Sequence, residues 1–417
     1  MKKDKGLYTV RYALINILYF VCFCTIHAFA AVFLLDKGFS NTEVGVLLAI
    51  ANVVSAIAQP FIAGLIDKPG FFTNRNVIMG CSGIIIIGSL ILMTVNDIRV
   101  IIFVIFALIY MIQFAYQPVL TALVFEYQEA GCNIFYGLAR GLGSAGFAIA
   151  SAFMGGIVER NGVNVLLYGN IITMVLLILI TFFFKKPEGA LSESKAEADG
   201  SSQDEGLNSG AEGEKTGNEA HNNIFEFIKV YPSFFVLLLS VVLLFFGHNM
   251  LNDYLIQIIR NVGGAETELG YATFLAAILE LPAMATISLI IKKVSSNKLL
   301  AMAGIFFTVK VLIMVFAGNM FMVYLSQAFQ MLAYAVFIPA SAYYVNENMQ
   351  KYDQVKGQAF ITSCFTLAGV FSSLVCGVVL DHMGVKAMLL IGLAVSIIGT
   401  LVMLKAVLVK KTDNQAR

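Results

Sequence analysis

Two short stretches of the chain decide its fold: GGIVERNGV at residues 155–163 and GVVLDHMGV at residues 377–385. The second repeats the first at an offset of 222 residues, and the matching pairs are Gly155 and Gly377, Glu159 and Asp381, Gly162 and Gly384, and Val163 and Val385. Pro60 and Pro282 are related by the same offset, and both lie inside long apolar runs. Because duplicated halves made of membrane-length apolar segments are typical of two-bundle secondary transporters, the repeat predicts that architecture.

The composition points to the same class. The chain has 417 residues, of which 59% are hydrophobic and 13% are charged, and its mean hydropathy is +0.83. A soluble domain carries roughly 25% charged residues, whereas a membrane span needs an apolar run of about 20 residues. Twelve such runs are present, at residues 12–35, 42–66, 77–95, 100–125, 134–158, 163–184, 230–259, 268–291, 299–316, 320–345, 357–380 and 385–406.

These runs predict an all-α membrane protein with twelve transmembrane helices in two six-helix bundles related by a pseudo-twofold repeat. Residues 1–184 form the first bundle and residues 230–417 the second. The connector comprises residues 185–229, and from Lys185 to Asn223 it is rich in Glu, Ser, Gly, Ala and Asn and almost lacks large apolar residues. Such a segment buries too little surface to offset its ordering entropy, so we expect a disordered loop.

The basic residues predict the orientation. Of the 27 Lys and Arg, 20 fall on the side of the two termini and the connector and 5 on the other side, while Arg140 and Lys310 lie within spans. Cytoplasmic loops carry an excess of Lys and Arg, so the termini and the connector are expected in the cytoplasm. We expect a multi-pass protein of the cell membrane that is monomeric. The net charge of +1 gives no indication of a nucleic-acid partner.

Ionisable residues inside spans are costly and therefore mark functional sites. Arg140 lies about two turns into the fifth span, among glycines that allow a neighbouring helix to approach: Gly137, Gly143 and Gly146. The arginine is expected to bind substrate. The alternatives are a structural ion pair with Glu126 or a side chain that reaches the membrane interface.

Around Arg140 the chain resembles a known group. The block Tyr136-Gly137-x-x-Arg140-x-x-Gly143-Ser144-x-x-Phe147 is similar to the fifth helix of lactose permease and of phenylpropionate-permease-like proteins, oligosaccharide:proton symporter-like members of the major facilitator superfamily. The loop after the second span resembles the gating motif of that superfamily, with Asp67, Lys68, Gly70 and Arg75 in the motif positions. Its first glycine is replaced by Ala63 and its arginine is displaced.

The resemblance implies roles for individual residues. In sugar permeases of this type, an arginine holds sugar hydroxyls beside an aromatic ring, and these positions are Arg140 and Phe147 here. The partner carboxylate falls on Ala122, with Glu126 one turn nearer the cytoplasm. The arginine of the ninth helix corresponds to Lys310, and the histidine and carboxylate of the tenth helix correspond to Gln330 and Ala333. The lactose-type proton relay is therefore absent from its usual place.

Other titratable residues offer substitutes for that relay. His27 and His248 occupy equivalent positions on spans one and seven, and histidine titrates near neutral pH. Glu280 lies in the middle of the eighth span, where desolvation disfavours its charged form unless Lys310 neutralises it. Histidine in the seventh helix and glutamate in the eighth resemble the phenylpropionate-permease pattern. We predict that Glu280, His248, Lys310 and Asp253 couple transport to protons, Asp253 from nearer the external end.

The predicted substrate site collects residues from both halves: Arg140, Phe147, Glu126, His27, Asn249, Asn252 and Gln330. The favoured function is proton-coupled symport of a small organic solute, preferably a sugar or oligosaccharide, by alternating access. Alternatives are an aromatic-acid or nucleoside permease and a proton-antiporting drug exporter. We expect no enzyme, no bound metal and no cofactor, because the four histidines are scattered and no G-x-x-x-x-G-K-[ST] loop is present. The expected partners are the substrate, protons and the lipid bilayer.

Overall fold

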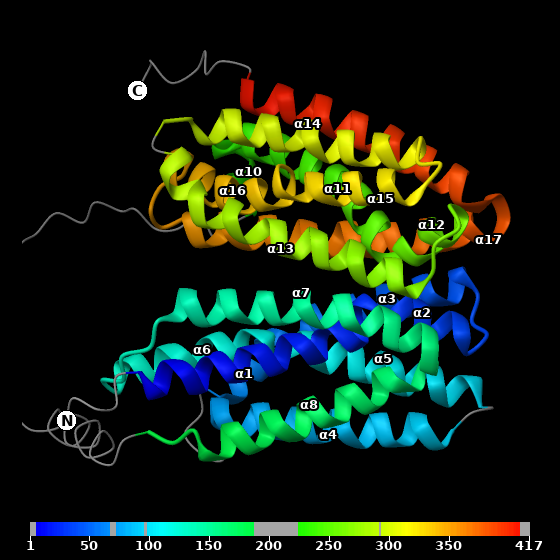
Figure 1. Ribbon diagram of the computed structural model, residues 1–417. Helices are drawn as coiled ribbons and strands as arrows, with labels where there is room; N and C mark the ends of the chain where they lie inside the picture. Colours follow the sequence, from blue (N-terminus) through cyan, green and yellow to red (C-terminus); the bar gives the residue numbers. More distant parts are fainter. Residues whose placement is uncertain (1–5, 67–71, 96–97, 187–223, 292, 409–417) are drawn as a thin grey trace, which may run out of the picture.

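The computed structural model describes residues 6–66, 72–95, 98–186, 224–291 and 293–408, and every regular element in these ranges is a helix. Figure 1 shows two bundles, one from each half of the chain. The N-terminal bundle contains α1 (Leu7–Phe23), η1 (Cys24–Ala28), α2 (Ala30–Asp36), α3 (Asn41–Ile66), α4 (Asn74–Thr94), α5 (Arg99–Ala115), α6 (Gln117–Glu129), α7 (Tyr136–Asn161) and α8 (Asn164–Phe183). The C-terminal bundle contains α10 (Ile224–Val230), α11 (Pro232–Asp253), α12 (Leu255–Asn261), α13 (Glu266–Ile290), α14 (Ser296–Val315), α15 (Met320–Ala328), η2 (Phe329–Met331), α16 (Tyr334–Asn348) and α17 (Gln354–Leu408).

These helices give the twelve predicted spans. In the described ranges, eleven helices are long and apolar enough to cross a membrane. The longest, α17, has 55 residues and contains the last two spans, because Gly384 breaks its helical backbone with φ 78°. At 1.5 Å per residue, 55 residues extend to roughly 80 Å, more than two bilayer cores. The predicted all-α, two-bundle fold is therefore confirmed.

Four spans are interrupted rather than continuous. Span one breaks at Phe29 after the π-helix η1, and span seven, its equivalent, breaks at Tyr254. Span four breaks at Tyr116, just before Pro118 at the start of α6, and span ten passes through the 3₁₀ segment η2. Because a broken helix releases backbone polar groups, such breaks are tolerated at membrane depth only inside protein or beside water. The interruptions therefore mark the inner part of each bundle.

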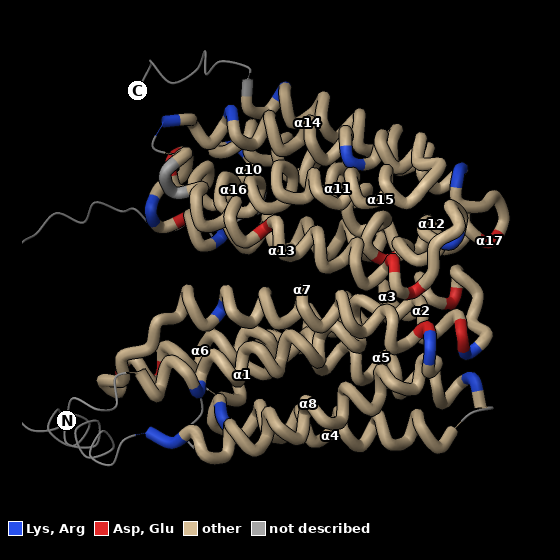
Figure 2. The backbone as a smooth tube through the Cα atoms, viewed as in Figure 1, with Lys and Arg blue, Asp and Glu red and all other residues tan. Residues whose placement is uncertain are grey.

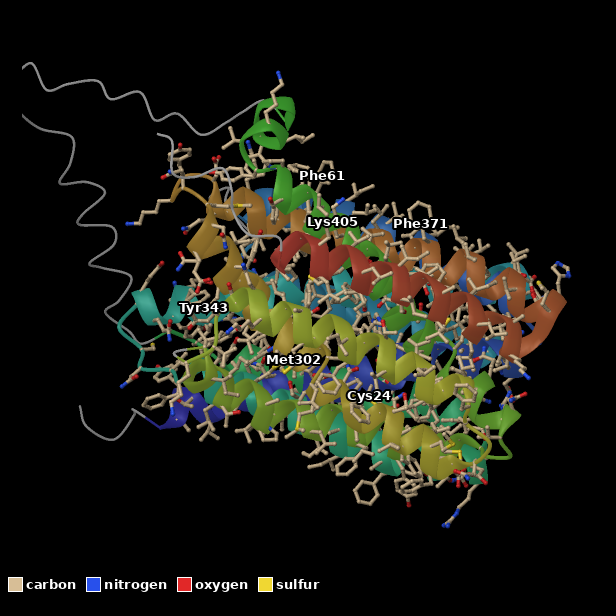
Figure 3. All side chains as sticks on the ribbon, turned by 90° about the horizontal axis from the view of Figure 1, so that it is seen from above. Cys24, Phe61, Met302, Tyr343, Phe371 and Lys405 are labelled. Atoms are coloured by element: carbon tan, nitrogen blue, oxygen red, sulfur yellow. The ribbon has the colours of Figure 1, made fainter. Side chains whose placement is uncertain are left out.

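Both termini lie at one end of the molecule, which we call the terminal end; the opposite end, which carries residues 37–41, 161–164, 261–266 and 384, is called the far end (Figure 1). Lys, Arg, Asp and Glu gather at these two ends, with few between them (Figure 2). The outside of the bundles is covered by exposed apolar side chains such as Phe61 and Phe371, as expected of a surface in contact with lipid (Figure 3).

Two expectations fall wholly or partly outside the described residues. Asp67, Lys68 and Gly70 of the predicted gating loop are among them, so only Arg75 of that motif is placed. Residues 187–223 of the connector also lie outside. The connector was expected to run to residue 229, but the helix α10 already begins at Ile224, and its Phe227 is fully buried. The cause is the apolar sequence of α10, IFEFIKV, which supplies a side chain for the core of the second bundle.

The two halves touch through glycines at the far end. On α7 and α13, a Cβ atom added at Gly155 would overlap the carbonyl oxygen of Glu266, and one added at Gly270 would overlap that of Ser151. On α3 and α17, a Cβ atom at Gly45 would overlap the carbonyl oxygen of Ser373. Backbone therefore meets backbone at both crossings, as in the small-residue contacts of membrane helices.

Replacing Gly155 with alanine is expected to separate the halves at the far end, because the added methyl group meets rigid backbone. A cysteine introduced at the fully buried Ser151 should then react with a water-soluble maleimide about tenfold faster, since a steric cost of roughly 1–3 kcal/mol falls on the closed contact. Gly137→Ala is the matched control, because a Cβ atom at Gly137 of the same helix meets nothing within 4 Å. Equal labelling in both variants would contradict the tight crossing.

Candidate functional site

Arg140 is held on α7 by contacts within its own half. Its Nη1 donates to Ser144 Oγ at 2.9 Å, one turn further along the helix. Its guanidinium lies over the ring of Phe20 of α1, 4.1 Å from the ring centroid. A Cβ atom at Gly143 would come within 2.8 Å of Phe20, so this glycine allows α1 to pack close to the arginine. Of the three predicted packing glycines, Gly143 and Gly146 are confirmed, whereas Gly137 meets open space.

Aromatic side chains surround His27 on the inner face of the same half. The imidazole stacks on the ring of Phe23 with the ring centroids 3.8 Å apart. The ring of Tyr110 also contacts it, with a centroid distance of 3.8 Å. Phe23 in turn lies 6.4 Å from Phe147. Both ring nitrogens of His27 are buried and form no hydrogen bond with the described residues. His27 lies in the π-helix η1, and such bulges are frequent at functional sites.

The C-terminal half contributes a chain of three polar side chains. Lys310 Nζ donates to Gln330 Oε1 at 2.6 Å, and Gln330 Nε2 donates to Glu280 Oε1 at 2.9 Å. Lys310 is 1% exposed, whereas Glu280 is partly exposed. Gln330, in the 3₁₀ segment η2, therefore separates the ammonium group from the carboxyl group. The direct Glu280–Lys310 ion pair considered from the sequence is not formed.

His248 lies beside this chain. Its Nε2 is 3.0 Å from the amide nitrogen of Asn252, and its ring stacks on Tyr334 at 5.0 Å. The charge of Lys310 acts on His248. Asn249 donates weakly to the carbonyl oxygen of Phe365 at 3.5 Å. The predicted residues His248, Asn249 and Asn252 are therefore placed along one side of α11, next to the predicted coupling residues.

The two halves bring these groups toward one another. The charge of Arg140 acts across the interface on Glu280 and on Tyr334. All three side chains are partly exposed, as is Phe147, so they border accessible space rather than sealed packing. The arrangement places a cation with unused donors opposite a carboxyl group with an unused oxygen, because Glu280 Oε2 accepts no hydrogen bond from the described residues.

Glu126 and Arg75 lie apart from this arrangement, and Asp253 lies at its edge, where its charge acts on Tyr110. Glu126 forms an ion pair with Lys186 at 2.9 Å and accepts from Asn74 at 2.8 Å, at the terminal end of the first half. It does not pair with Arg140. Asp253 accepts from Ser373 Oγ at 2.8 Å, nearer the far end. Arg75 lies beside Tyr127 at the terminal end, which is where a loop motif is expected.

Several residues of the site were not predicted from the sequence: Phe20, Phe23, Tyr110, Ser144 and Tyr334. Two of them carried a usable signal, because Ser144 follows Arg140 and Tyr334 follows Gln330 by four positions, the spacing of helix neighbours. The other three, Phe20, Phe23 and Tyr110, gave none, since the chain has 34 phenylalanines and 16 tyrosines.

Comparison with known proteins places the chain within one family and one fold. Residues 9–391 match the MFS_1 like family. The nucleoside transporter NupG, in a mutant form, is 12% identical, with a TM-score of 0.77 over 96% of this chain and 99% of NupG. A bacterial homolog of the human lysosomal transporter Spinster, in an inward-facing and occupied conformation, is 12% identical with a TM-score of 0.66, covering 97% of each chain. None of the curated proteins compared with the chain matches it significantly.

Proposed function

Because the chain belongs to the MFS_1 like family, we propose that it is a secondary transporter that carries a small hydroxylated solute together with protons by alternating access. A sugar or oligosaccharide is the favoured substrate. The terminal end faces the cytoplasm in this proposal, in accord with the excess of basic residues on that side. The cell membrane is the proposed location.

One observation carries the proposal: Arg140 and Glu280 face the interface from opposite halves, and each has hydrogen-bonding atoms that are not used within the part of the protein that the structure describes. These atoms are the remaining N–H donors of Arg140 and the Oε2 acceptor of Glu280. A guanidinium has five N–H donors, of which one is bound to Ser144. A sugar hydroxyl both donates and accepts, so neighbouring hydroxyl groups match a donor fork on one side and a carboxyl oxygen on the other. Phe147 supplies an apolar face beside them. A solute bound in this way contacts both bundles, as alternating access requires.

Proton coupling is proposed at Glu280. In the cycle, an external proton neutralises Glu280, the solute binds near Arg140 and Phe147, and the bundles rock to expose both to the cytoplasm. The buried Lys310 favours release of that proton, and Gln330 transmits its influence through the two hydrogen bonds described above. His248, which also responds to the charge of Lys310, is the second titratable group of the proposed relay.

A nucleoside is the second candidate substrate, favoured by the aromatic side chains around His27. Flat rings at Phe23, His27 and Tyr110 lie next to Phe147 and suit a planar base, while Arg140 and Glu280 suit ribose hydroxyls. The fold neighbour NupG is described as a nucleoside transporter. An aromatic acid would use Arg140 as its carboxylate partner, and a proton-driven drug exporter remains the third alternative.

The test is substrate-induced proton movement in proteoliposomes that contain the purified protein. Galactose, lactose, uridine, adenosine and 3-phenylpropionate are added one at a time while the external pH is recorded. Alkalinisation with one sugar supports the proposal, and alkalinisation with a nucleoside alone selects the second candidate. Uptake of radiolabelled solute without any proton signal would overturn proton symport.

Replacing Gln330 with leucine is expected to weaken proton coupling. The change removes the bridge between Lys310 and Glu280 and leaves the ammonium without its acceptor. Hydrogen bonds to charged groups contribute about 1.5–3 kcal/mol, so the accumulation ratio driven by a pH gradient should fall about tenfold. Gln327→Leu, one turn earlier on α15, is the control, because the amide nitrogen of Gln327 has no hydrogen-bond partner among the residues that the structure describes. Equal effects of the two changes would contradict the bridging role.

A further inference from the structure

The repeat that identifies the two halves also joins them at the far end. Asp381 follows span eleven and accepts four hydrogen bonds from the start of α3 in the other half. The donors are Asn41 N at 3.0 Å, Asn41 Nδ2 at 2.9 Å, Thr42 N at 2.7 Å and Thr42 Oγ1 at 2.5 Å. We call this set the Asp381 latch.

Its counterpart in the repeat makes an equivalent contact in the opposite direction. Glu159, at the end of α7, accepts from Thr267 N at 3.1 Å and from Thr267 Oγ1, at the start of α13 in the second half. We call this set the Glu159 latch. Each carboxylate lies three residues before a glycine with positive φ, Gly162 or Gly384. The capped helices also follow glycines with positive φ: α3 begins three residues after Gly38, and α13 begins three residues after Gly263. The whole contact is therefore duplicated.

The chemistry of each latch is that of a helix N-terminal cap supplied by the other half. The first amide groups of a helix have no acceptor within it, and its N-terminus attracts negative charge. The helices concerned, α3 with 26 residues and α13 with 25, are long. The latches lie directly above the glycine crossings at Gly45 and Gly155, so they can form only while the halves touch there.

The two latches are not equal, because the capped helices begin with different residues. The first residue of α3 is Asn41, whereas the first residue of α13 is Glu266. Asn41 adds a side-chain amide donor to the Asp381 latch and also accepts from Gln257 at 2.9 Å. Glu266 occupies the corresponding place beside Glu159 and brings a second negative charge, which it directs to Arg260. The Glu159 latch therefore has two donors instead of four, because the Glu266 side chain offers no donor and pairs with Arg260.

We propose that Asp381 and Glu159 hold the far end closed as two trans-acting helix caps, that the Asp381 latch is the stronger, and that Glu266 is the residue that weakens the other. The far end then opens first along α7 and α13 and last along α3 and α17. This asymmetry is built into two copies of one repeat by the residue at the start of the capped helix, Asn41 or Glu266, and by the acceptor, Asp381 or Glu159. It holds for any cargo, since neither latch contacts the proposed substrate site.

The experiment measures maleimide labelling of a cysteine introduced at Ser151, in nanodiscs and without substrate. Native cysteines give little background, because five of the six are buried; the parent protein corrects for Cys81. Asp381→Ala should raise the labelling rate about fivefold and Glu159→Ala about threefold. Glu43→Gln is the matched control, since among the described residues this carboxylate at the same end bonds only to Ser40 and Arg99 of its own half.

Glu266→Asn provides the decisive variant, because it should strengthen a latch instead of breaking it. The proposal expects labelling about threefold slower than in the parent, and this gain must vanish when Glu159→Ala is present. A variant that merely misfolds would label faster, so the two cases are distinguished. Faster or unchanged labelling in Glu266→Asn, or equal labelling in Asp381→Ala and Glu43→Gln, would overturn the proposal. Since neither substrate nor a proton gradient is used, failure of the proposed function leaves this test unaffected.

Discussion

Replacing Arg140 with alanine is expected to abolish measurable solute binding and transport. The guanidinium is the one cation of the proposed substrate site that belongs to the first half, and Ser144 and Phe20 fix its orientation. Loss of two hydrogen bonds from a charged donor, at about 1.5–3 kcal/mol each, lowers affinity by at least 100-fold. Isothermal titration with the solute identified in the proteoliposome panel checks this directly.

Two further variants separate recognition from general damage. Arg140→Lys keeps the charge but loses the planar donor fork, so an intermediate loss of affinity is expected. Arg160→Ala removes an exposed arginine from the far end of the same helix and should bind solute normally. If Arg140→Ala bound solute as tightly as Arg160→Ala, the arginine would have a structural role only.

Replacing Glu280 with glutamine is expected to separate solute movement from proton movement. The amide keeps the size of the side chain and its hydrogen bond with Gln330, but it cannot take up or release a proton. Solute exchange between equal concentrations should continue, whereas accumulation against a gradient should disappear. The pH dependence should change with a definite sign: wild-type uptake falls as the external pH rises and deprotonates Glu280, and the variant stays constant.

The measurement compares exchange and accumulation in the same proteoliposomes. Glu268→Gln is the control, since its carboxyl group lies on the same helix and caps the backbone of Ala265 outside the site. If Glu280→Gln still accumulated solute in response to a pH gradient, the coupling carboxyl would have to be sought elsewhere, and Asp253 would be the next residue to replace.

The fold was predictable because the bilayer imposes a length on every span. The predicted run 299–316 became α14 over Ser296–Val315, and the run 163–184 became α8 over Asn164–Phe183. The breaks inside spans were harder to foresee. Pro118 lies at the break in span four, whereas no proline lies beside the break at Tyr254.

The sequence predicted how deep in the membrane the residues of the candidate site lie, but not which of them contact one another. Glu280 and Lys310 were expected at one level, which follows from counting residues along two helices. The insertion of Gln330 between them depends on the 3₁₀ segment η2, which rotates that side chain relative to a regular helix. The pairing of Glu126 with Lys186 likewise requires the end of α6 to meet the chain beyond α8, a contact that pattern and spacing do not specify.

The position of the glycine crossings also determines how far the opposite ends of the helices move when the bundles rotate. While the far end is closed, they hold α7 near one of its ends; this helix has 26 residues and is therefore about 39 Å long. The part of the helix from Tyr136 to Gly155 is about 28 Å long, so a rotation of roughly 15° about the crossing moves its other end by about 7 Å. A small rotation at the crossing thus produces a large displacement at the opposite end of the helix.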